Sequence, residues 1–201
     1  MNETLQKSCT AFDGNRRLAA GALPDVARKV KYALEGGATG PVFIFDDSTG
    51  RVIDLDTRGT ADDVVARLEA DSMPRGPGRP KLGVVAREVT LLPRHWDWLN
   101  SQPGGASVAL RKLVETARRA NGDQDRRRAA QEAAHRFLSA MAGNAAGYEE
   151  ALRALYADDR RRFADLAAAW PEDVRDHAIK LAFADLEPSA SPAAGAVPGR
   201  G

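Results

Sequence analysis

Cysteine and histidine are scarce in this sequence, which has one cysteine and three histidines among 201 residues. A lone cysteine excludes an internal disulfide and a cysteine-rich zinc site. Cys9 lies beside Thr10 and Phe12 in a strand-like run, which predicts a small buried apolar residue. The histidines stand singly, too far apart in the sequence for a local metal site, at positions His95, His135 and His177. We therefore expect neither a metal nor another cofactor.

Long apolar runs and catalytic motifs are also missing. No apolar stretch approaches the roughly 18 residues that span a bilayer, and the N-terminal stretch MNETLQKSCTAF lacks the basic start and apolar run of a secretion signal. These absences predict a cytoplasmic protein without a membrane partner. The motifs GxSxG and GxxxxGK(S/T), and a GxGxxG after a strand, do not occur. We therefore do not expect an enzyme.

Positive charge is concentrated in the middle of a chain whose net charge is only +1. Residues 71–121 carry nine basic and four acidic side chains, a net charge of +5. Residues 1–70 and residues 122–201 each have a net charge of −2. Such a local excess is typical of a binding site for a polyanion, and the alternative is a solvated basic linker without a partner.

The first half of an α+β unit over residues 1–70 is predicted from turn and helix signals. Cys9–Gly21 is expected to form two short strands around the turn Asp13-Gly14-Asn15, because glycine and asparagine tolerate positive φ. A helix should follow, with Pro24 in its first turn, apolar residues at spacing i, i+4 and i+8, and Gly36-Gly37 as its stop.

The second half of this unit is predicted from alternation and capping. Val42 to Phe45 is apolar on both faces and indicates a covered strand, whereas Arg51 to Asp56 alternates and indicates a half-exposed one. Thr60 and Asp63 have the spacing of a capping box and should begin a last helix. The predicted order is ββαββα.

Four aspartates in the second strand pair, Asp46, Asp47, Asp54 and Asp56, raise the question of a metal or acid–base site. Turn chemistry explains the first two, because residues 46–50 have the composition of a bulged hairpin turn. The other two alternate with apolar residues and should face water. We therefore interpret the aspartates as structural.

Helical periodicity dominates residues 122–186. Four helices are predicted from apolar stripes and end signals, around Ala130–Met141, Tyr148–Tyr156, Phe163–Trp170 and Val174–Leu181. The residues after 186 have too little apolar bulk to pack, so residues 187–201 are predicted to be a disordered tail.

The basic Pro/Gly linker, residues 71–83, contains the stretch RGPGRPKLG. A Gly-Arg-Pro core flanked by basic residues resembles the AT-hook type of minor-groove binder. Glycine and proline keep such a backbone narrow, so arginine can lie in a groove whose negative potential is strongest over A·T tracts. The resemblance implies DNA contacts by Arg75, Arg79 and Lys81.

Residues 86–119, within the predicted segment 84–121, are similar to the ribbon-helix-helix family of DNA-binding proteins. The residues that carry this resemblance are a strand around Arg87 to Leu91, Pro93 opening a helix, a Pro-Gly-Gly break and a second apolar helix. In that family two chains pair their strands into a ribbon that enters the major groove. Arg87 departs from the pattern because it falls at an inner, normally apolar position, and the strand register could shift by one residue.

Site residues follow from this resemblance by position. Thr90 would lie on the outer face of the ribbon, and Ala106-Ser107 would anchor a phosphate at the N-terminus of the second helix, where free N–H groups and the helix dipole favour an anion. We expect Arg111 and Lys112 of the same helix to contact phosphates together with Ser107. Trp96 and Trp98 lie about 200° apart on the first helix, so at least one is available for a dimer interface or for the C-terminal helices.

Nearly the whole chain, from Thr10 to roughly Ala182, also resembles a bacterial family catalogued only as a domain of unknown function, through stretches such as TAFDGNRRLAAG, FDDSTGR and WPEDVRDHA. That family implies no activity. From the residues we predict an α+β protein that binds DNA as a homodimer, either a transcriptional regulator or a nucleoid-associated protein. The alternative is a protein-interaction module that binds no nucleic acid.

Overall fold

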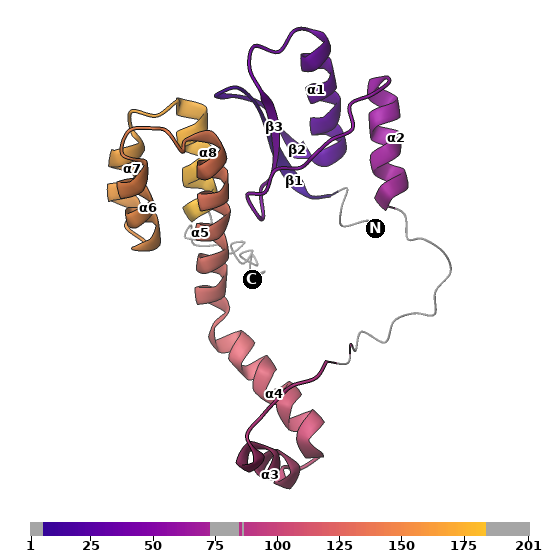
Figure 1. The fold of residues 1–201 in the computed structure, drawn as a ribbon, viewed down its shortest axis with the longest axis vertical. Coiled ribbons are helices and arrows are strands. Elements are labelled where there is room, and N and C mark those ends of the chain that lie inside the picture. Colours follow the sequence, from indigo (N-terminus) through magenta and orange to yellow (C-terminus); the bar gives the residue numbers. More distant parts are fainter. Residues whose placement is uncertain (1–5, 73–84, 86, 184–201) are drawn as a thin grey trace, which may run out of the picture.

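In the computed structural model, which describes residues 6–72, 85 and 87–183, the chain begins with the predicted β-hairpin (Figure 1). Strand β1 (Ser8–Asp13) pairs antiparallel with β2 (Arg16–Ala22). Gly14 in the connecting loop has a φ of 55°, a conformation that glycine adopts without strain. Cys9 is fully buried in β1, as its sequence context predicts.

The sheet contains three strands rather than the expected four. Strand β3 (Val42–Asp46) pairs antiparallel with the other side of β1, so the order is β2-β1-β3. Residues 51–56 do not form a strand: only an isolated bridge joins Phe45 and Val52. Their exposure alternates as predicted, but the backbone pairing with β3 ends at Ile53, which donates to the Ile44 carbonyl at 2.7 Å.

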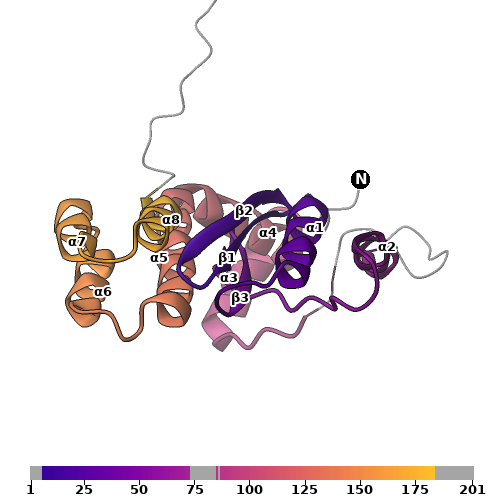
Figure 2. The same ribbon diagram turned by 90° about the horizontal axis from the view of Figure 1, so that it is seen from above.

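Helices α1 (Leu23–Glu35) and α2 (Ala61–Ser72) lie on one side of the sheet (Figure 2). Buried residues of β1, β3 and α1 form an apolar cluster there, and Leu68 of α2 packs against it. The predicted capping box at the start of α2 is confirmed. The backbone N–H of Thr60 donates to Asp63 Oδ2 at 2.8 Å, and the N–H of Asp63 donates to Thr60 Oγ1 at 3.2 Å.

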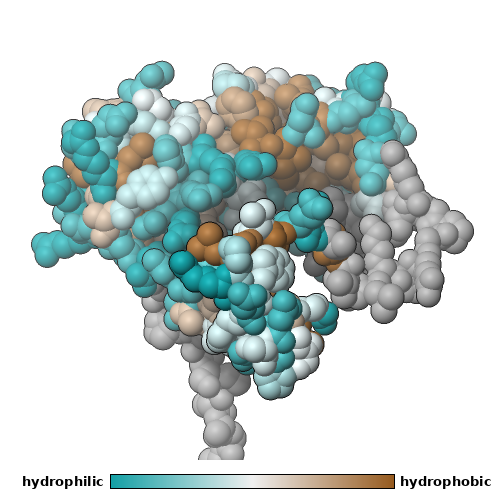
Figure 3. Space-filling view, turned by 60° about the horizontal axis from the view of Figure 1, so that its bottom comes forward, coloured by the Kyte–Doolittle hydropathy of each residue, from teal (hydrophilic) through white to brown (hydrophobic). Residues whose placement is uncertain are grey.

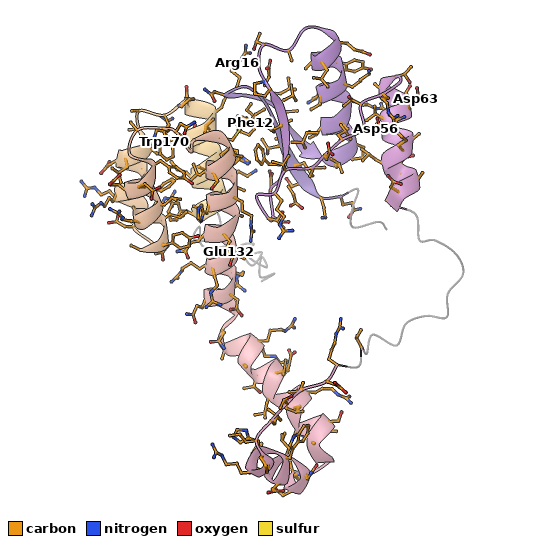
Figure 4. All side chains as sticks on the ribbon, in the orientation of Figure 1. Phe12, Arg16, Asp56, Asp63, Glu132 and Trp170 are labelled. Carbon is orange, nitrogen blue, oxygen red and sulfur yellow. The ribbon has the colours of Figure 1, made fainter. Side chains whose placement is uncertain are left out.

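The opposite face of the sheet packs on the C-terminal helices (Figure 4). The Phe12 ring of β1 lies 5.4 Å from Phe137 and 5.5 Å from His177, measured between ring centroids. Phe45 of β3 lies 4.9 Å from Phe137 in an edge-to-face arrangement. The N-terminal sheet and the C-terminal helices therefore share one apolar core.

The four C-terminal helices form where the periodicity predicts them, except that the third ends at Ala167 rather than at Trp170. Their bounds are α5 (Gly122–Met141), α6 (Tyr148–Tyr156), α7 (Arg160–Ala167) and α8 (Glu172–Phe183). Trp170, just after α7, is buried and donates its indole N–H to the Ala146 carbonyl at 2.9 Å. The predicted disordered tail, residues 187–201, lies outside the described residues.

The remaining helices, α3 (Pro93–Ser101) and α4 (Gly105–Ala120), form a helical hairpin that extends away from the sheet and from α6–α8 (Figure 1). Asn121 ends α4 and caps α5, so the hairpin is joined directly to the long helix α5. The predicted α+β class is confirmed. Among the helices of the described chain, none has the length and apolar character needed to cross a bilayer.

Candidate nucleic-acid interface

The α3–α4 hairpin begins at Pro93, as the sequence predicts. Proline occupies the first turn, where its missing N–H costs no helical hydrogen bond. The N–H groups of His95 and Trp96 both donate to the Leu92 carbonyl. Helix α3 ends near Gln102, whose N–H donates to the Leu99 carbonyl at 3.2 Å. The helix is therefore short, and it buries Leu99 as its anchor.

Two glycines make the turn between the helices. Gly104 and Gly105 have φ values of 86° and 73°, which most side chains adopt only with strain. A Cβ atom added to Gly104 would also lie 3.2 Å from the side chain of Val108. The Pro-Gly-Gly break thus sets the tight reversal that brings α4 against α3.

The N-terminus of α4 has the features of a phosphate contact. Its first turn carries no acidic residue and no side-chain cap, and the helix dipole favours an anion at this end. Ser107 lies in that turn, and its Oγ atom accepts a hydrogen bond of 2.9 Å from the Arg111 guanidinium group. Both side chains, like Lys112, are exposed.

Helix α4 separates charge from apolar surface. At about 100° per residue, one face carries Ser107, Arg111, Lys112, Glu115, Arg118 and Arg119. Arg118 and Arg119 both pair with Glu115, at 3.5 and 3.1 Å. The opposite face carries Ala109, Leu110 and Leu113, and of the whole helix only Ala109 is buried. The basic face therefore points to solvent with a net charge of +3.

The apolar face of the hairpin is open. A pocket of about 270 Å³ lies between the helices, lined by Leu91, His95, Trp98, Leu99, Leu110 and Leu113. Trp98 is 51% exposed, and Leu113 and Val114 are 48% and 63% exposed. Large apolar side chains gathered at this exposure are typical of a protein-interaction surface.

The expected ribbon strand is not formed in the single chain. Residues 87–92 lead into α3 without strand pairing to any described residue, and Thr90 and Val89 are exposed. A ribbon strand pairs with the same strand of a second copy, so one chain alone lacks the partner that would complete it. The predicted residues Arg75, Arg79 and Lys81 lie outside the described residues.

Two groups of residues were missed by the sequence reasoning. Arg118 and Arg119 extend the basic face. They follow Arg111 and Lys112 by seven residues, or about two helical turns, and this spacing in the sequence predicts that both pairs lie on one face. The other group joins Asp47 of the 46–50 turn to His177 and Lys180 of α8. No local sequence pattern predicts this contact, because Asp47 and the two α8 residues are far apart in the sequence.

Burial sets the electrostatics of this second group. His177 is 1% exposed, and burial lowers its pKa to about 4, although the neighbouring Asp47 carboxylate opposes this shift. Asp47 accepts from Ser8 Oγ at 2.8 Å and from Lys180 Nζ at 3.3 Å. No group of three or more cysteine, histidine or acidic residues in the described ranges is arranged to hold a metal ion.

Comparison with known proteins identifies the family. A protein-family profile described as "Uncharacterized protein conserved in bacteria (DUF2239)" matches residues 8–182. The chain belongs to this family. The matched residues include the sheet, the α3–α4 hairpin and most of α8. Comparison of this DUF2239 chain with curated proteins and with solved structures gave no match.

Proposed function

We propose that this protein binds DNA as a homodimer and acts as a transcriptional regulator or a nucleoid-associated protein. The α3–α4 hairpin carries the proposal, because it extends from the shared core and has a basic face opposite an open apolar face. Each face suits one part of the function. Positive side chains at a helix N-terminus bind phosphate, and exposed apolar side chains associate with a partner.

A second copy is the partner that fits the apolar face. The unpaired segment 87–92 lies next to the pocket through Leu91, so one two-fold contact pairs two segments and covers two pockets. Such a contact leaves Ser107, Arg111 and Lys112 free on the other face of α4. The dimer therefore presents two phosphate-binding helix ends in addition to the basic linker.

DNA binding at α4 is tested by replacing Arg111 and Lys112 together with alanine. Each lost phosphate contact reduces the slope of log affinity against log salt by about 0.9, so the double variant should bind more weakly, with a slope lower by roughly 2 units. The matched control replaces Arg16 and Lys29, which are exposed in the N-terminal unit and carry the same charge. Equal effects of both pairs would reject a specific role for α4.

The second candidate function, a protein-interaction module without DNA, rests on the open pocket beside Trp98 and Leu113. Under that function the pocket binds another protein and the basic residues are solvated. A double variant of Arg111 and Lys112 that leaves every DNA measurement unchanged, together with a hairpin that remains monomeric, would favour it.

A further inference from the structure

The two edges of the sheet differ. Along β2, the backbone N–H of Arg17 donates to Asp173 Oδ2 of α8 at 2.8 Å, so α8 covers part of this edge. Along β3, residues 51–53 pair with only its C-terminal half. The N–H of Asp46 donates to the Arg51 carbonyl at 2.9 Å, and the N–H of Ile53 donates to the Ile44 carbonyl at 2.7 Å. An edge strand left open is a template for pairing with another chain.

The backbone pairing between residues 51–53 and β3 ends before it reaches Val42, the first residue of β3. Because Ile44 bonds outward to Ile53, Val42 two positions earlier presents its N–H and C=O to the same side. In a continued hairpin Leu55 would pair with Val42, but residues 54–57 diverge and no described residue bonds to that side of Val42. The divergence leaves a wedge between β3 and residues 54–57.

A groove of about 360 Å³, lined mostly by apolar residues, occupies this wedge. Its walls come from α1, β3 and the diverging segment, and include Leu34, Val42, Val52, Asp54 and Leu55. Leu34 and Val52 are 42% and 49% exposed although both are large and apolar. Figure 3 shows apolar surface in brown on the N-terminal unit. The groove therefore combines an open strand edge with uncovered apolar walls.

The charges of the groove indicate the character of its occupant. Asp54 lines the groove, is exposed and has no hydrogen-bond or ion-pair partner among the described residues, whereas the neighbouring Asp56 pairs with Arg58 and Arg67. An unpaired carboxylate beside an apolar groove is complementary to a basic side chain. A stable contact between two folded copies buries about 1,200 to 2,000 Å² in total, which a half-open strand edge of five residues does not supply.

We propose that this wedge is a docking site for an extended peptide segment of another protein. The segment adds to β3 at Val42 by backbone pairing, as in β-strand addition. Apolar side chains on one face of the segment enter the groove against Leu34 and Leu55, and a basic side chain lies beside Asp54. This site is separate from the α3–α4 hairpin and does not depend on DNA binding.

The test uses a random heptapeptide library displayed on phage and selected on the full-length protein. Enriched peptides should alternate apolar and polar residues, carry lysine or arginine, and bind the Leu34→Asp variant at least tenfold more weakly than the wild type. Amide NMR shifts on adding a synthetic copy of one enriched peptide should centre on residues 42–44 and 54–57. Leu34 is partly exposed, and circular dichroism establishes that the variant is folded.

Two further variants make the outcome decisive. Asp54→Lys should reverse the charge preference of the selected peptides, and Tyr32→Asp, an exposed position of α1 that does not line the groove, should leave peptide binding unchanged. The proposal is overturned if selection enriches nothing, if the peptides bind Leu34→Asp as tightly as the wild type, or if the shifts centre elsewhere. A Leu34→Asp variant that loses self-association instead would assign the groove to a second copy and would also overturn it.

Discussion

His177 and Asp47 face each other across the seam between α8 and the 46–50 turn, with 3.7 Å between His177 Nε2 and Asp47 Oδ1. Both atoms are buried, and neither has a hydrogen-bond partner in the described structure. The His177 ring lies 4.7 Å from that of Phe137 between centroids. An imidazole in these surroundings is held neutral, because burial penalises its charged form more than Asp47 stabilises it.

Acid should therefore weaken this seam. The pKa of His177 is lowered from 6.5 to about 4 in the folded protein, so between these values the unfolded chain binds more protons than the folded one. The free energy of unfolding contains the full contribution of neutral His177 above pH 6.5. It falls as the pH decreases toward 4, by on the order of 3 kcal/mol. Urea unfolding at several pH values measures this loss.

The histidine responsible is identified by substitution. His177→Leu should remove most of the loss of unfolding free energy between pH 6.5 and 4. His135→Leu should retain the loss, since His135 is not buried and binds the Tyr156 hydroxyl at 2.7 Å. If both variants keep the wild-type pH profile, the assignment to His177 is wrong.

Gly50 fixes the approach of the 46–50 turn to α5. Its φ is 65°, and an added Cβ atom would lie 1.9 Å from the carbonyl oxygen of Ala133. Gly50→Ala should lower the free energy of unfolding by about 2 to 4 kcal/mol, from backbone strain and a forced shift of the turn. Thermal and urea unfolding provide the measurement.

Gly37 provides the matched control for this substitution. It has a φ of 83° but no atom within 4 Å of an added Cβ. Gly37→Ala should therefore cost only the backbone strain, about 1 to 2 kcal/mol. Equal costs at both positions would show that the contact between the turn and α5 is unimportant.

Features set by neighbouring residues were predictable from the sequence. The Asp13-Gly14-Asn15 turn depends on glycine at positive φ, and the start of α2 depends on the reciprocal contact between Thr60 and Asp63. The C-terminal helices follow from apolar periodicity, and the exposed Ser107, Arg111 and Lys112 follow from their place on α4.

Features that depend on distant partners were not predictable in this way. Residues 51–56 alternate like a strand, yet only the tertiary structure decides that their pairing with β3 ends at Ile53. Phe12 and Phe137 share a core although no local pattern connects them. The 87–92 segment has β-type residues, yet it pairs with no described residue.

Dimerisation is expected to depend on the open face of the hairpin. Sedimentation should show that the wild-type protein is a dimer at tens of micromolar. This concentration corresponds to a free energy of dimerisation of roughly 6 kcal/mol or more in favour of the dimer. Leu113→Asp should weaken the dimer at least tenfold, because it places a charge in the apolar contact. Tyr32→Asp, at an exposed position of α1, should not. A monomeric wild-type protein would contradict the proposed ribbon.

The basic linker is expected to contribute contacts of its own. Replacing Arg75, Arg79 and Lys81 with alanine should lower the salt slope of DNA binding by roughly 2 to 3 units. Any preference for A·T-rich duplexes should also shrink, since the narrow minor groove attracts arginine. The control replaces three exposed basic residues of the N-terminal unit, Arg16, Lys29 and Arg51. Matching losses in both triple variants would indicate a nonspecific effect of charge.

The most direct test is titration of the wild-type protein with a fluorescent A·T-rich duplex at several salt concentrations. If the linker and α4 bind phosphate, log affinity should fall linearly with log salt, with a slope of about −3 or steeper. A protein that shows no salt-dependent binding even at low ionic strength would contradict the proposed function and leave the interaction module as the alternative.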